Sequence, residues 1–564
     1  MSKKWQYYQT NQEEVEKLEK EYKINKLLAT ILVNRGITVE NANIFLNPTR
    51  KDFHDPKLMP DMNIAVERIL QAIEKKEKTI IYGDYDVDGI TSITVLKSFL
   101  TERGLEVDEY IPNRISEGYG LNKQAIEKIA SKNYNLMITV DCGITAIEEV
   151  EYAKEFGIET IITDHHEPGE NLPKAIAVVD CKRKENIYPF RELAGVGVVF
   201  KLIQAIGQKQ GLEEKEYLKY LDIVSLGTIS DIVPLIDENR VITKLGLKLV
   251  ACTKNSGLKA ILNSIGFGKI DSGVISFGVA PRINACGRMG YANDALELLL
   301  SKNETEAQEK VSVLNKYNNE RQEKEKIIFE DAIKQIETNH LDEEEAIVLG
   351  GEGWHHGVIG IVASKITDMY FKPCILVCFE NGEEIGKGSG RSIPGFDLHK
   401  ALLECSKDLE GFGGHSMAIG LSVKKETFEK FKKEFQKIVA KQNICDIIPI
   451  INIDAILKIY EITKEMVKTL SLLEPFGEAN KTPNFAFKNL KIDSIRALTE
   501  GKHLKLTLKS NNNTYINAIG FNFGYLASEY KIGDKIDIVG NLEINTYNGV
   551  ESIQINLKDI MKSI

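Results

Sequence analysis

Four short segments of this sequence carry aspartate and histidine side chains at spacings that could hold divalent metal ions. They are Gly83–Gly89 (GDYDVDG), Asp141–Gly143 (DCG), Asp164–His166 (DHH) and Asp231 within SLGTISDIVPL. Carboxylate oxygens with one or two imidazoles suit Mg²⁺ or Mn²⁺, whereas structural zinc is usually bound by thiolates. Two such ions roughly 3.5–4 Å apart can activate water and stabilise an in-line phosphoryl displacement. The residue types therefore predict a metal-dependent phosphoesterase.

The elements that must position these side chains are buried strands. The first three segments each follow an apolar, β-branched run, namely KTIIY, LMITV and ETIIT. Each run predicts a strand, and in an open α/β sheet ligands bind at the carboxyl edge of the strands. We therefore expect the four segments to meet at one edge of one sheet.

Each acidic residue also has a structural interpretation. Asp84, Asp86 and Asp88 could form a solvated acidic turn, but three adjacent carboxylates repel one another unless cations lie among them. A calcium-binding EF-hand loop is excluded, because Val95 stands where that loop needs a glutamate and no helix leads in. Asp141 alone could be a helix N-cap, and Asp231 could mark a helix start. The metal site is the interpretation that accounts for all the segments together.

The histidine pair has to divide its roles. His165 and His166 are adjacent, so their side chains diverge and cannot easily share one ion. We expect one imidazole to bind metal and the other to face a substrate phosphate, with Asp164 orienting an imidazole from behind. Asp141 is the carboxylate that could bridge two ions.

Composition predicts a cytoplasmic chain without membrane segments. The chain has 564 residues, 43% of them hydrophobic, and a net charge of −10. The N-terminus has no apolar signal region, and no apolar run approaches the ~20 residues of a membrane helix. The eight cysteines form no CxxC pair and are interpreted as reduced, mostly buried thiols. The acidic net charge argues on its face against a nucleic-acid partner, but the tail from Ala486 to Ile564, with ten Lys/Arg and eight Asp/Glu, permits a nucleic-acid surface without establishing one.

Alternating strand and helix patterns predict an α/β fold with a mostly parallel, doubly wound sheet. Residues 304–337 lack Gly and Pro and predict one long connector helix, with a helical hairpin as the alternative. A smaller α/β unit and then several short strands follow, which suit an OB-like barrel. The expected division is 1–60, a helical docking segment; 61–300, the catalytic domain; 301–340, the connector; 341–448, the second α/β domain; and 449–564, the barrel.

The motifs GDYDVDGITS, VDCG, DHH, SLGTISDIVPL and PRINACGRMG, in this order, resemble the DHH phosphoesterase superfamily. GEGWHHGVIGIVASK, GKGSGRSI and GGH resemble its accessory domain, DHHA1, and a following barrel is similar to the RecJ family of single-strand-specific exonucleases. The resemblance implies two Mn²⁺ or Mg²⁺ ions held by Asp84, Asp86, Asp88, Asp141, His165 and Asp231. It also implies catalytic roles for Asp141 and His165, and for His166 at the scissile phosphate.

The same resemblance implies a substrate-binding set. Its members offer guanidinium forks and small polar groups that fit phosphate oxygens. They are Arg114, Arg282, Arg288, Ser389, Arg391 and His415. The barrel adds aromatic residues that could stack on bases without reading sequence, although at least half are expected in its core. These are Phe485, Tyr515, Phe521, Phe523, Tyr525 and Tyr547.

The function implied is a 5′→3′ single-stranded-DNA exonuclease that releases 5′-mononucleotides in recombination and repair. Possible partners are a single-strand DNA-binding protein and a RecQ-type helicase. The alternative within the superfamily is an oligoribonuclease, cyclic-dinucleotide phosphodiesterase or pyrophosphatase acting on small substrates. A non-catalytic DNA-binding scaffold is a third possibility, which the intact set of metal ligands disfavours.

Overall fold

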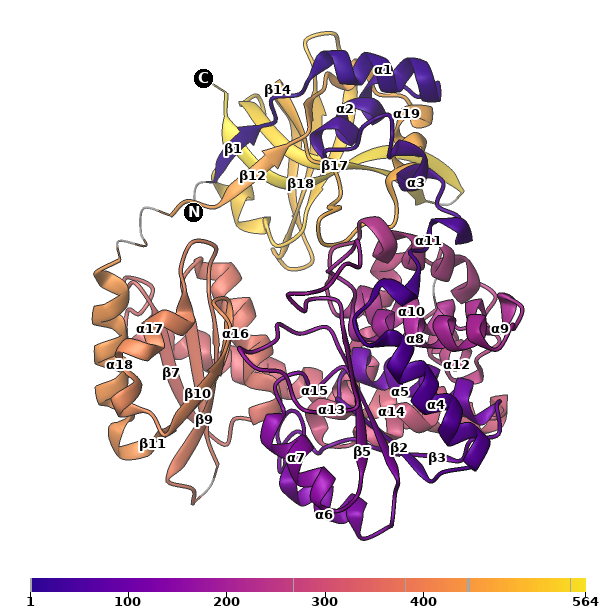
Figure 1. The fold of residues 1–564 in the computed structure, drawn as a ribbon. Helices are drawn as coiled ribbons and strands as arrows, with labels where there is room; N and C mark the ends of the chain where they lie inside the picture. Colours follow the sequence, from indigo (N-terminus) through magenta and orange to yellow (C-terminus); the bar gives the residue numbers. More distant parts are fainter. Residues whose placement is uncertain are drawn as a thin grey trace. The chain divides into compact units, whose positions relative to one another are not determined.

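The computed structural model describes residues 3–266, 268–380, 382–442, 444, 447–547 and 549–563. The chain divides into two compact units (Figure 1). One comprises residues 54–231 and 246–447, and the other comprises residues 1–53, 232–245 and 448–564. No helix among the described residues combines the length and the apolar character needed to cross a membrane.

The first unit contains the predicted doubly wound sheet. Its strands lie in the order β3 (Val107–Tyr110), β2 (Thr79–Gly83), β4 (Leu136–Val140), β5 (Glu159–Asp164) and β6 (Ala177–Asp180), and all pairings are parallel. Strands β2 and β4 are buried at every residue, as expected for strands covered on both faces. This confirms the fold class. The carboxyl ends of β2, β4 and β5 carry the three acidic segments.

Helices cover both faces of this sheet. α6 (Lys123–Ala130) and α7 (Ile147–Glu155) pack together on one face, and α4 (Met62–Lys75), α5 (Val87–Thr101) and α8 (Gly195–Lys209) lie on the other (Figure 1). The remaining helices of this part are α9 (Lys215–Leu218), α10 (Leu221–Ser230), α12 (Ser256–Ile265), α13 (Ala280–Met289) and α14 (Ala292–Leu299), with a π-helical turn, η3 (Val274–Val279). α5 and α8 begin at the sheet edge that carries the acidic segments.

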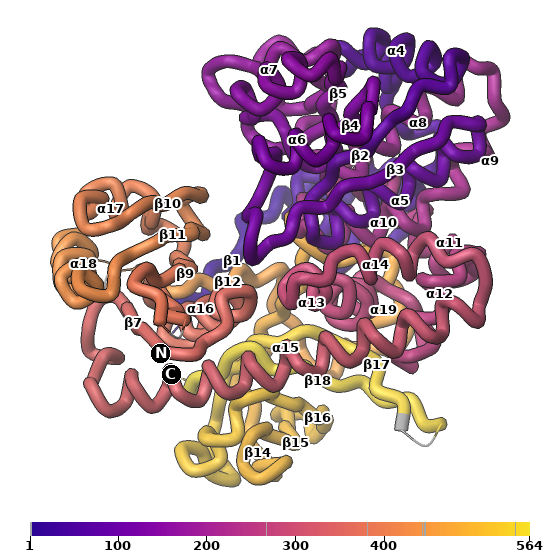
Figure 2. Tube along the Cα trace, turned by 90° about the horizontal axis from the view of Figure 1, so that it is seen from below, coloured from indigo at the N-terminus to yellow at the C-terminus, as the bar shows by residue number. Residues whose placement is uncertain are grey.

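The connector is one uninterrupted helix, α15 (Glu304–Thr338; Figure 2), which excludes the hairpin alternative. Its 35 residues span about 52 Å at 1.5 Å per residue. Buried apolar side chains recur along it at helical spacing: Ala307, Val311, Leu314, Ile328, Ala332 and Ile336. α15 contacts α13 at one end and α16 of the next domain at the other.

The second α/β domain has a mixed sheet. Its strand order is β10 (Gly411–Gly414), β11 (Ala418–Lys424), β9 (Ile385–Arg391), β8 (Cys374–Phe379) and β7 (Ile347–Glu352), and only β7 and β8 are parallel. The helices are α16 (His356–Tyr370), α17 (Leu398–Glu404) and α18 (Lys425–Ala440). The strand β9 carries Ser389 and Arg391.

The other unit is built around the barrel strands β14 (Phe485–Leu498), β15 (His503–Lys509), β16 (Tyr515–Gly520), β17 (Lys535–Tyr547) and β18 (Val550–Lys562), with β13 (Ala455–Ile456) beside β14. Pairing of β14 with β17 closes the barrel. One apolar core joins the barrel to α1 (Gln12–Tyr22), α2 (Lys26–Asn34) and α3 (Ala42–Leu46). β1 (Lys4–Tyr7) pairs with β12 (Ile450–Ile453), and α19 (Lys464–Thr469) completes the unit.

The structure departs from the expected domain limits at residues 232–245. These residues fall inside the predicted catalytic domain, but the first turns of α11 (Asp237–Val250) pack with the barrel unit. The buried guanidinium of Arg240 stacks on the ring of Phe45 and donates hydrogen bonds to the carbonyls of Phe45 and Glu474 at 2.7 and 3.0 Å. Hydrophobic periodicity cannot reveal this placement, because a buried arginine reads as a surface residue.

Candidate active site

The acidic segments meet at the sheet edge, as expected. Ligand atoms of three groups each lie within 4.8 Å of one another: Asp84, Asp86 and Asp141; Asp88, His165 and Asp231; and Asp141, His165 and His166. The groups share Asp141 and His165, so they form one cluster. Together the groups bring enough carboxylate and imidazole ligand atoms to one place to hold two divalent ions.

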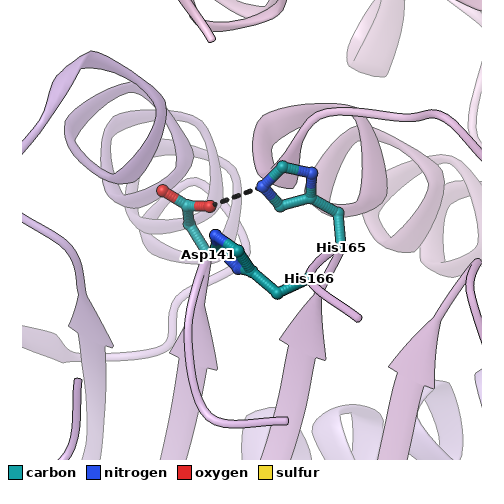
Figure 3. Close-up of side chains that lie close together, drawn as sticks. All are labelled: Asp141, His165 and His166. Atoms are coloured by element: carbon teal, nitrogen blue, oxygen red, sulfur yellow. Dashed lines mark ion pairs between the residues drawn. The ribbon is translucent and has the colours of Figure 1, made fainter. Parts of the chain in front are cut away.

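Asp141 lies at the centre of the cluster. Its Oδ1 is 3.1 Å from Nε2 of His165, and His166 lies beside both side chains (Figure 3). Its backbone adopts the left-handed conformation with φ of 58°, which short polar residues tolerate better than others. The Asp141 amide donates a 3.1 Å hydrogen bond to the carbonyl of Thr163 and so ties the end of β4 to β5. A Cβ atom on Gly195 would lie 2.7 Å from Asp141 Oδ1, so α8 approaches the cluster too closely for a side chain there.

Two helix N-termini hold the other acidic residues. Oδ1 of Asp86 accepts hydrogen bonds from the amides of Asp88 and Gly89 at 2.9 and 3.1 Å, and so caps α5. The Asp88 carboxylate accepts hydrogen bonds from the amides of Gly195 and Val196 at 2.6 and 2.8 Å, at the start of α8. Asp231 follows the last residue of α10, with its Oδ2 3.6 Å from Nε2 of His165. Helix N-termini therefore orient two carboxylates of the first segment, whereas Asp231 stands at the C-terminus of α10.

The electrostatics of the cluster call for cations. Burial, with Asp86 adding to it, raises the pKa of Asp88 to about 7 and the pKa of Asp84 well above its usual range. Burial and the neighbouring carboxylates also raise the pKa values of Asp141 and Asp231. Buried carboxylates this close cannot all ionise unless positive charge lies among them.

Buried polar atoms without a hydrogen-bond partner also indicate that the site fits a metal ion. Oδ1 of Asp84 and both ring nitrogens of His165 are buried without a hydrogen-bond partner among the described residues. Burial and the neighbouring His166 lower the pKa of His165 to about 3, which leaves its imidazole neutral. Neutral imidazole and carboxylate are the forms that bind divalent ions. The donor set therefore fits Mg²⁺ or Mn²⁺.

His166 differs from His165 in both exposure and charge. Its side chain is 37% exposed, against 8% for His165. Burial opposes protonation of His166, but the hydrogen bond from its Nδ1 to Asp164, 2.7 Å long, raises its pKa to about 9. The two adjacent imidazoles therefore differ in charge: His165 is neutral and His166 is cationic.

A cavity of about 360 Å³ opens beside His166. Tyr119 and Asp164 line it from the first domain, and His415 lines it from the turn between β10 and β11. The Tyr119 hydroxyl donates a 3.3 Å hydrogen bond to the carbonyl of Asp141 and lies 3.3 Å from Nδ1 of His166. The sequence analysis did not single out Tyr119, although it stands five residues after Arg114 in the same predicted loop.

An arginine cluster lies next to the acidic one. Burial and the neighbouring Arg114, Arg321 and Arg391 lower the pKa of Arg288 to about 9. Arg114, Arg288 and Arg391 make no ion pair with a carboxylate within the described part of the chain. Arg321, beside them, is paired with Glu325. Three gathered guanidinium groups without an ion pair of their own favour an anion such as phosphate.

The members of this cluster come from four elements. Arg391 on β9 donates a 3.0 Å hydrogen bond to Ser389 Oγ. Arg114 lies over the ring of Tyr85 inside the GDYDVDG segment, 4.9 Å from its centroid. Arg288 donates to the carbonyl of Gly357 on α16. Arg321, which the sequence analysis missed, lies on the connector helix, where its surface-like charge pattern gave no signal.

Arg282 does not join this cluster. Its guanidinium donates hydrogen bonds to Asn315 Oδ1 at 2.7 Å and to the carbonyl of Gly278 at 2.8 Å. It therefore links α13 to the connector helix. Of the expected substrate-binding residues, Arg114, Arg288, Ser389 and Arg391 come together, while His415 lines the cavity beside His166.

The barrel aromatics divide between core and surface. Phe485 is fully buried and Phe523 packs against the apolar core. Tyr515, Phe521 and Tyr525 are exposed. The side chain of Tyr547 lies outside the described part of the structure. Three exposed rings therefore remain as candidates for stacking on bases.

Three family models match the chain. They are described as DHH family, N-terminal domain, over residues 78–228; DHHA1 domain, over 343–441; and RecJ OB domain, over 453–559. Single-stranded-DNA-specific exonuclease RecJ of Bacillus subtilis strain 168 is 40% identical over 99% of this chain and 70% of its own length. The enzyme of the same name from Dickeya dadantii is 31% identical over 95% of this chain and 96% of its own.

A solved structure shows the same fold. The crystal structure of RecJ from Thermus thermophilus in complex with Mn²⁺ matches with a TM-score of 0.87 and 27% identity, covering 100% of this chain and 80% of that one. A structure of the same enzyme in complex with Mg²⁺ matches with a TM-score of 0.77 and 26% identity, covering 100% of this chain and 79% of that one.

Proposed function

The chain belongs to the RecJ family of single-stranded-DNA-specific exonucleases, and from that premise we propose that it degrades single-stranded DNA from the 5′ end and releases 5′-mononucleotides. The observation that carries the proposal is the adjacency of two clusters. One gathers buried carboxylates with an imidazole whose nitrogens make no hydrogen bond among the described residues, and the other gathers Arg114, Arg288 and Arg391, which make no ion pair there. The acidic cluster suits metal-dependent hydrolysis, and the arginine cluster suits binding of a terminal phosphate.

Asp84, Asp86, Asp88, Asp141, His165 and Asp231 would hold two Mn²⁺ or Mg²⁺ ions, with Asp141 common to both. Such ions supply a water nucleophile at neutral pH and neutralise charge on the phosphoryl oxygens. The α5 and α8 N-termini fix Asp86 and Asp88 in advance, so the carboxylates need no rearrangement when substrate binds.

His166 contributes a proton-bearing group beside the ions. Asp164 holds its Nδ1, which leaves Nε2 for a substrate oxygen. As a cation, His166 can donate a hydrogen bond to the scissile phosphate and stabilise the charge that develops during displacement. This role rests on its exposure beside the 360 Å³ cavity.

The arginine cluster suits a strand end that carries a phosphate, and the family supplies the 5′ polarity. A terminal phosphate carries about −1.5 to −2 charge, more than an internal phosphodiester, so unpaired guanidinium groups favour a strand end. Arg114 opposes the rise in the pKa of Asp84, which means that the two clusters interact electrostatically. We assign the terminal phosphate to Arg288, Arg391 and Ser389, with the scissile bond at the acidic cluster.

Degradation of end-labelled strands tests the proposal. With Mn²⁺, strands labelled at the 5′ end should lose the label first as a mononucleotide, and 5′-phosphorylated strands should react faster than 5′-hydroxyl strands. Arg391→Gln should remove that difference, and Arg391→Lys should retain part of it, since lysine keeps the charge but not the fork. Release of a 3′ label first would contradict the polarity.

The short-substrate alternative is tested in the same assay. An oligoribonuclease or cyclic-dinucleotide phosphodiesterase would hydrolyse dinucleotides faster than long strands. We expect the opposite order of kcat/KM, because the barrel offers Tyr515, Phe521 and Tyr525 to additional bases. Faster turnover of dinucleotides alone would favour the alternative.

Partners and location follow from the substrate. An enzyme that consumes single strands depends on a helicase to expose them, so we propose a RecQ-type helicase and a single-strand DNA-binding protein as partners. We propose the cytoplasm, where bacterial DNA lies. Fluorescence anisotropy with the purified single-strand DNA-binding protein would measure the first contact; no binding below about 100 μM would argue against it.

A further inference from the structure

Two tyrosines form a parallel stack beside the arginine cluster. The rings of Tyr291, which follows α13, and Tyr317, on α15, lie 4.9 Å apart between centroids with an interplanar angle of 7°. Tyr291 is 52% exposed. One face of its ring rests on Tyr317, so the exposed surface includes the opposite face.

The stack is held from below. The Tyr317 hydroxyl donates a 2.9 Å hydrogen bond to Oδ2 of Asp294 on α14. The chain reaches Tyr291 through Gly290, which adopts φ of 88° at the end of α13, and the Tyr291 amide donates a 2.8 Å hydrogen bond to the carbonyl of Cys286. The Tyr317 ring and the Tyr291 backbone are therefore fixed, and the Tyr291 ring rests on Tyr317. A ligand that stacks on Tyr291 would therefore order few groups that are mobile beforehand.

The stack lies within one helical turn of the arginine cluster. Arg321 stands four residues after Tyr317 on α15, which places their Cβ atoms about 5–6 Å apart on one face of the helix. The positive charge of Arg321 acts on Arg288. Asn113, the residue before Arg114, also contacts the turn that carries Tyr291. Its Nδ2 donates a 3.1 Å hydrogen bond to the carbonyl of Gly290.

The second domain reaches the same place. Lys387 on β9 donates a 3.3 Å hydrogen bond to the carbonyl of Ile115, and a Cβ atom on Gly290 would lie 3.4 Å from Ile115 Cδ1. Ile115 therefore contacts both the turn that carries Tyr291 and the strand that carries Arg391. The stacked tyrosines thus flank the residues assigned to the terminal phosphate.

An exposed aromatic face next to phosphate-binding groups suits a nucleobase. Base–aromatic stacking contributes about 1–3 kcal/mol of binding free energy per base. It tolerates any base, because it does not use the hydrogen-bonding edge of the base. If Tyr291 served only to begin α14, its removal would affect substrates with and without a 5′-terminal base equally. We propose that Tyr291 stacks on the base of the 5′-terminal nucleotide and that Tyr317 is its fixed support. This deepens the proposed function and rests on it.

Strands that differ only at their first nucleotide test the inference. Two 5′-phosphorylated strands are compared, one complete and one with an abasic 5′-terminal residue, by the initial rate at which the 5′-terminal residue is released with Mn²⁺ over a range of strand concentrations. The wild-type enzyme should prefer the complete strand on the order of tenfold in kcat/KM. Tyr291→Ala should lose that preference by weakening only the complete strand, through KM. Tyr291→Phe should retain it, because phenylalanine also stacks.

Controls separate stacking from folding and from the function itself. Phe156→Ala removes another exposed ring, at the end of α7, and should leave the preference unchanged. If Tyr291→Ala lowers kcat/KM equally for both strands, or for neither, the inference is overturned. Degradation by the wild-type enzyme would in that case still support the nuclease assignment. Absence of wild-type degradation would overturn the proposed function instead. Thermal unfolding of each variant identifies a folding defect.

If the Tyr291→Ala variant does not fold, the fluorescence of a bound strand tests the inference instead of the kinetics. A 5′-terminal 2-aminopurine bound to Asp141→Asn protein should be quenched when Tyr291 is present and not in the double variant with Tyr291→Leu. Quenching that persists in the double variant would contradict the assignment.

Discussion

Asp164 accepts a 2.7 Å hydrogen bond from Nδ1 of His166, two residues further along the same segment. The same carboxylate accepts hydrogen bonds from the amides of His165 at 2.7 Å and Ile144 at 2.9 Å. Burial opposes ionisation of Asp164, but these partners, the His166 hydrogen bond above all, hold its pKa below the usual range. The pair is therefore an aspartate anion that keeps His166 cationic, and this has a measurable consequence.

Asp164→Asn should make the enzyme sensitive to alkaline pH. His166 has a pKa raised to about 9, so it is protonated at neutral pH and loses its proton as the pH rises through 9. Without the carboxylate its pKa should fall towards the ordinary value of about 6.5. The kcat–pH profile should then lose activity at lower pH than in the wild-type enzyme. Asp222→Asn, a buried aspartate on α10 that accepts a 2.6 Å hydrogen bond from Thr253, is the control and should leave the profile in place.

Asp141→Asn should separate hydrolysis from binding. Asparagine tolerates the left-handed backbone of position 141 better than alanine does, so the fold should persist. The loss of the shared carboxylate should lower kcat by a factor of about 10³ or more, while affinity for single-stranded DNA stays within about tenfold. Activity assays and anisotropy measure the two quantities; a parallel loss of both would contradict the assigned role.

The metal-free protein should become less stable as the pH rises. Asp84, Asp88, Asp141 and Asp231 have raised pKa values, so the folded chain binds more protons than the unfolded chain between about pH 4 and the folded-state values, about 7 for Asp88. Their stabilising contribution is complete below pH 4 and is lost through that window. Thermal unfolding with a chelator should show this, and the increase in Tm caused by Mn²⁺ should be larger at pH 8 than at pH 5.

Gly195→Ala should damage the metal site without a contact to substrate. The added methyl group would lie 2.7 Å from Oδ1 of Asp141 and would displace the α8 terminus that holds Asp88. We expect a weaker Mn²⁺ affinity and at least a tenfold loss of kcat/KM. Gly197→Ala is the control, because its methyl group meets only the side chain of Leu193, at 3.3 Å or more. Equal activity of the two variants would refute the explanation.

Arg240→Ala should destabilise the barrel unit by about 3 kcal/mol, since it leaves the carbonyls of Phe45 and Glu474 without a donor. Arg240→Lys should lose less, because the ammonium group can reach one of them. Denaturant unfolding measures the difference. Hydrolysis of short oligonucleotides under folded conditions should be unaffected; a loss there would contradict a purely structural role.

The sequence predicted the acidic cluster because its signal is local. Each of the three strands is a continuous apolar run, and its polar residues come immediately afterwards, so the sheet rule places Asp84, Asp141 and His165 at one edge. The connector helix was predictable for the same reason, since Glu304–Thr338 has no breaker.

Features that depend on tertiary packing could not be predicted. Arg282 and Arg288 belong to one motif, yet only Arg288 joins the arginine cluster, because Asn315 on another helix binds Arg282. Arg321 lies in a helix dense in charged residues, where nothing distinguishes it. Tyr119 lies in a loop, where no periodicity marks it, and only the fold brings its hydroxyl to the carbonyl of Asp141.

The barrel unit is discontinuous in sequence, since it gathers residues 1–53, 232–245 and 448–564. On the ribosome, α1–α3 emerge first, but the strands that share their apolar core are synthesised some four hundred residues later. Leu28 and Ile31 must therefore remain without their native partners while the intervening unit folds. The nascent chain should depend on chaperones during this interval, and a circular permutant that begins near residue 448 should need them less.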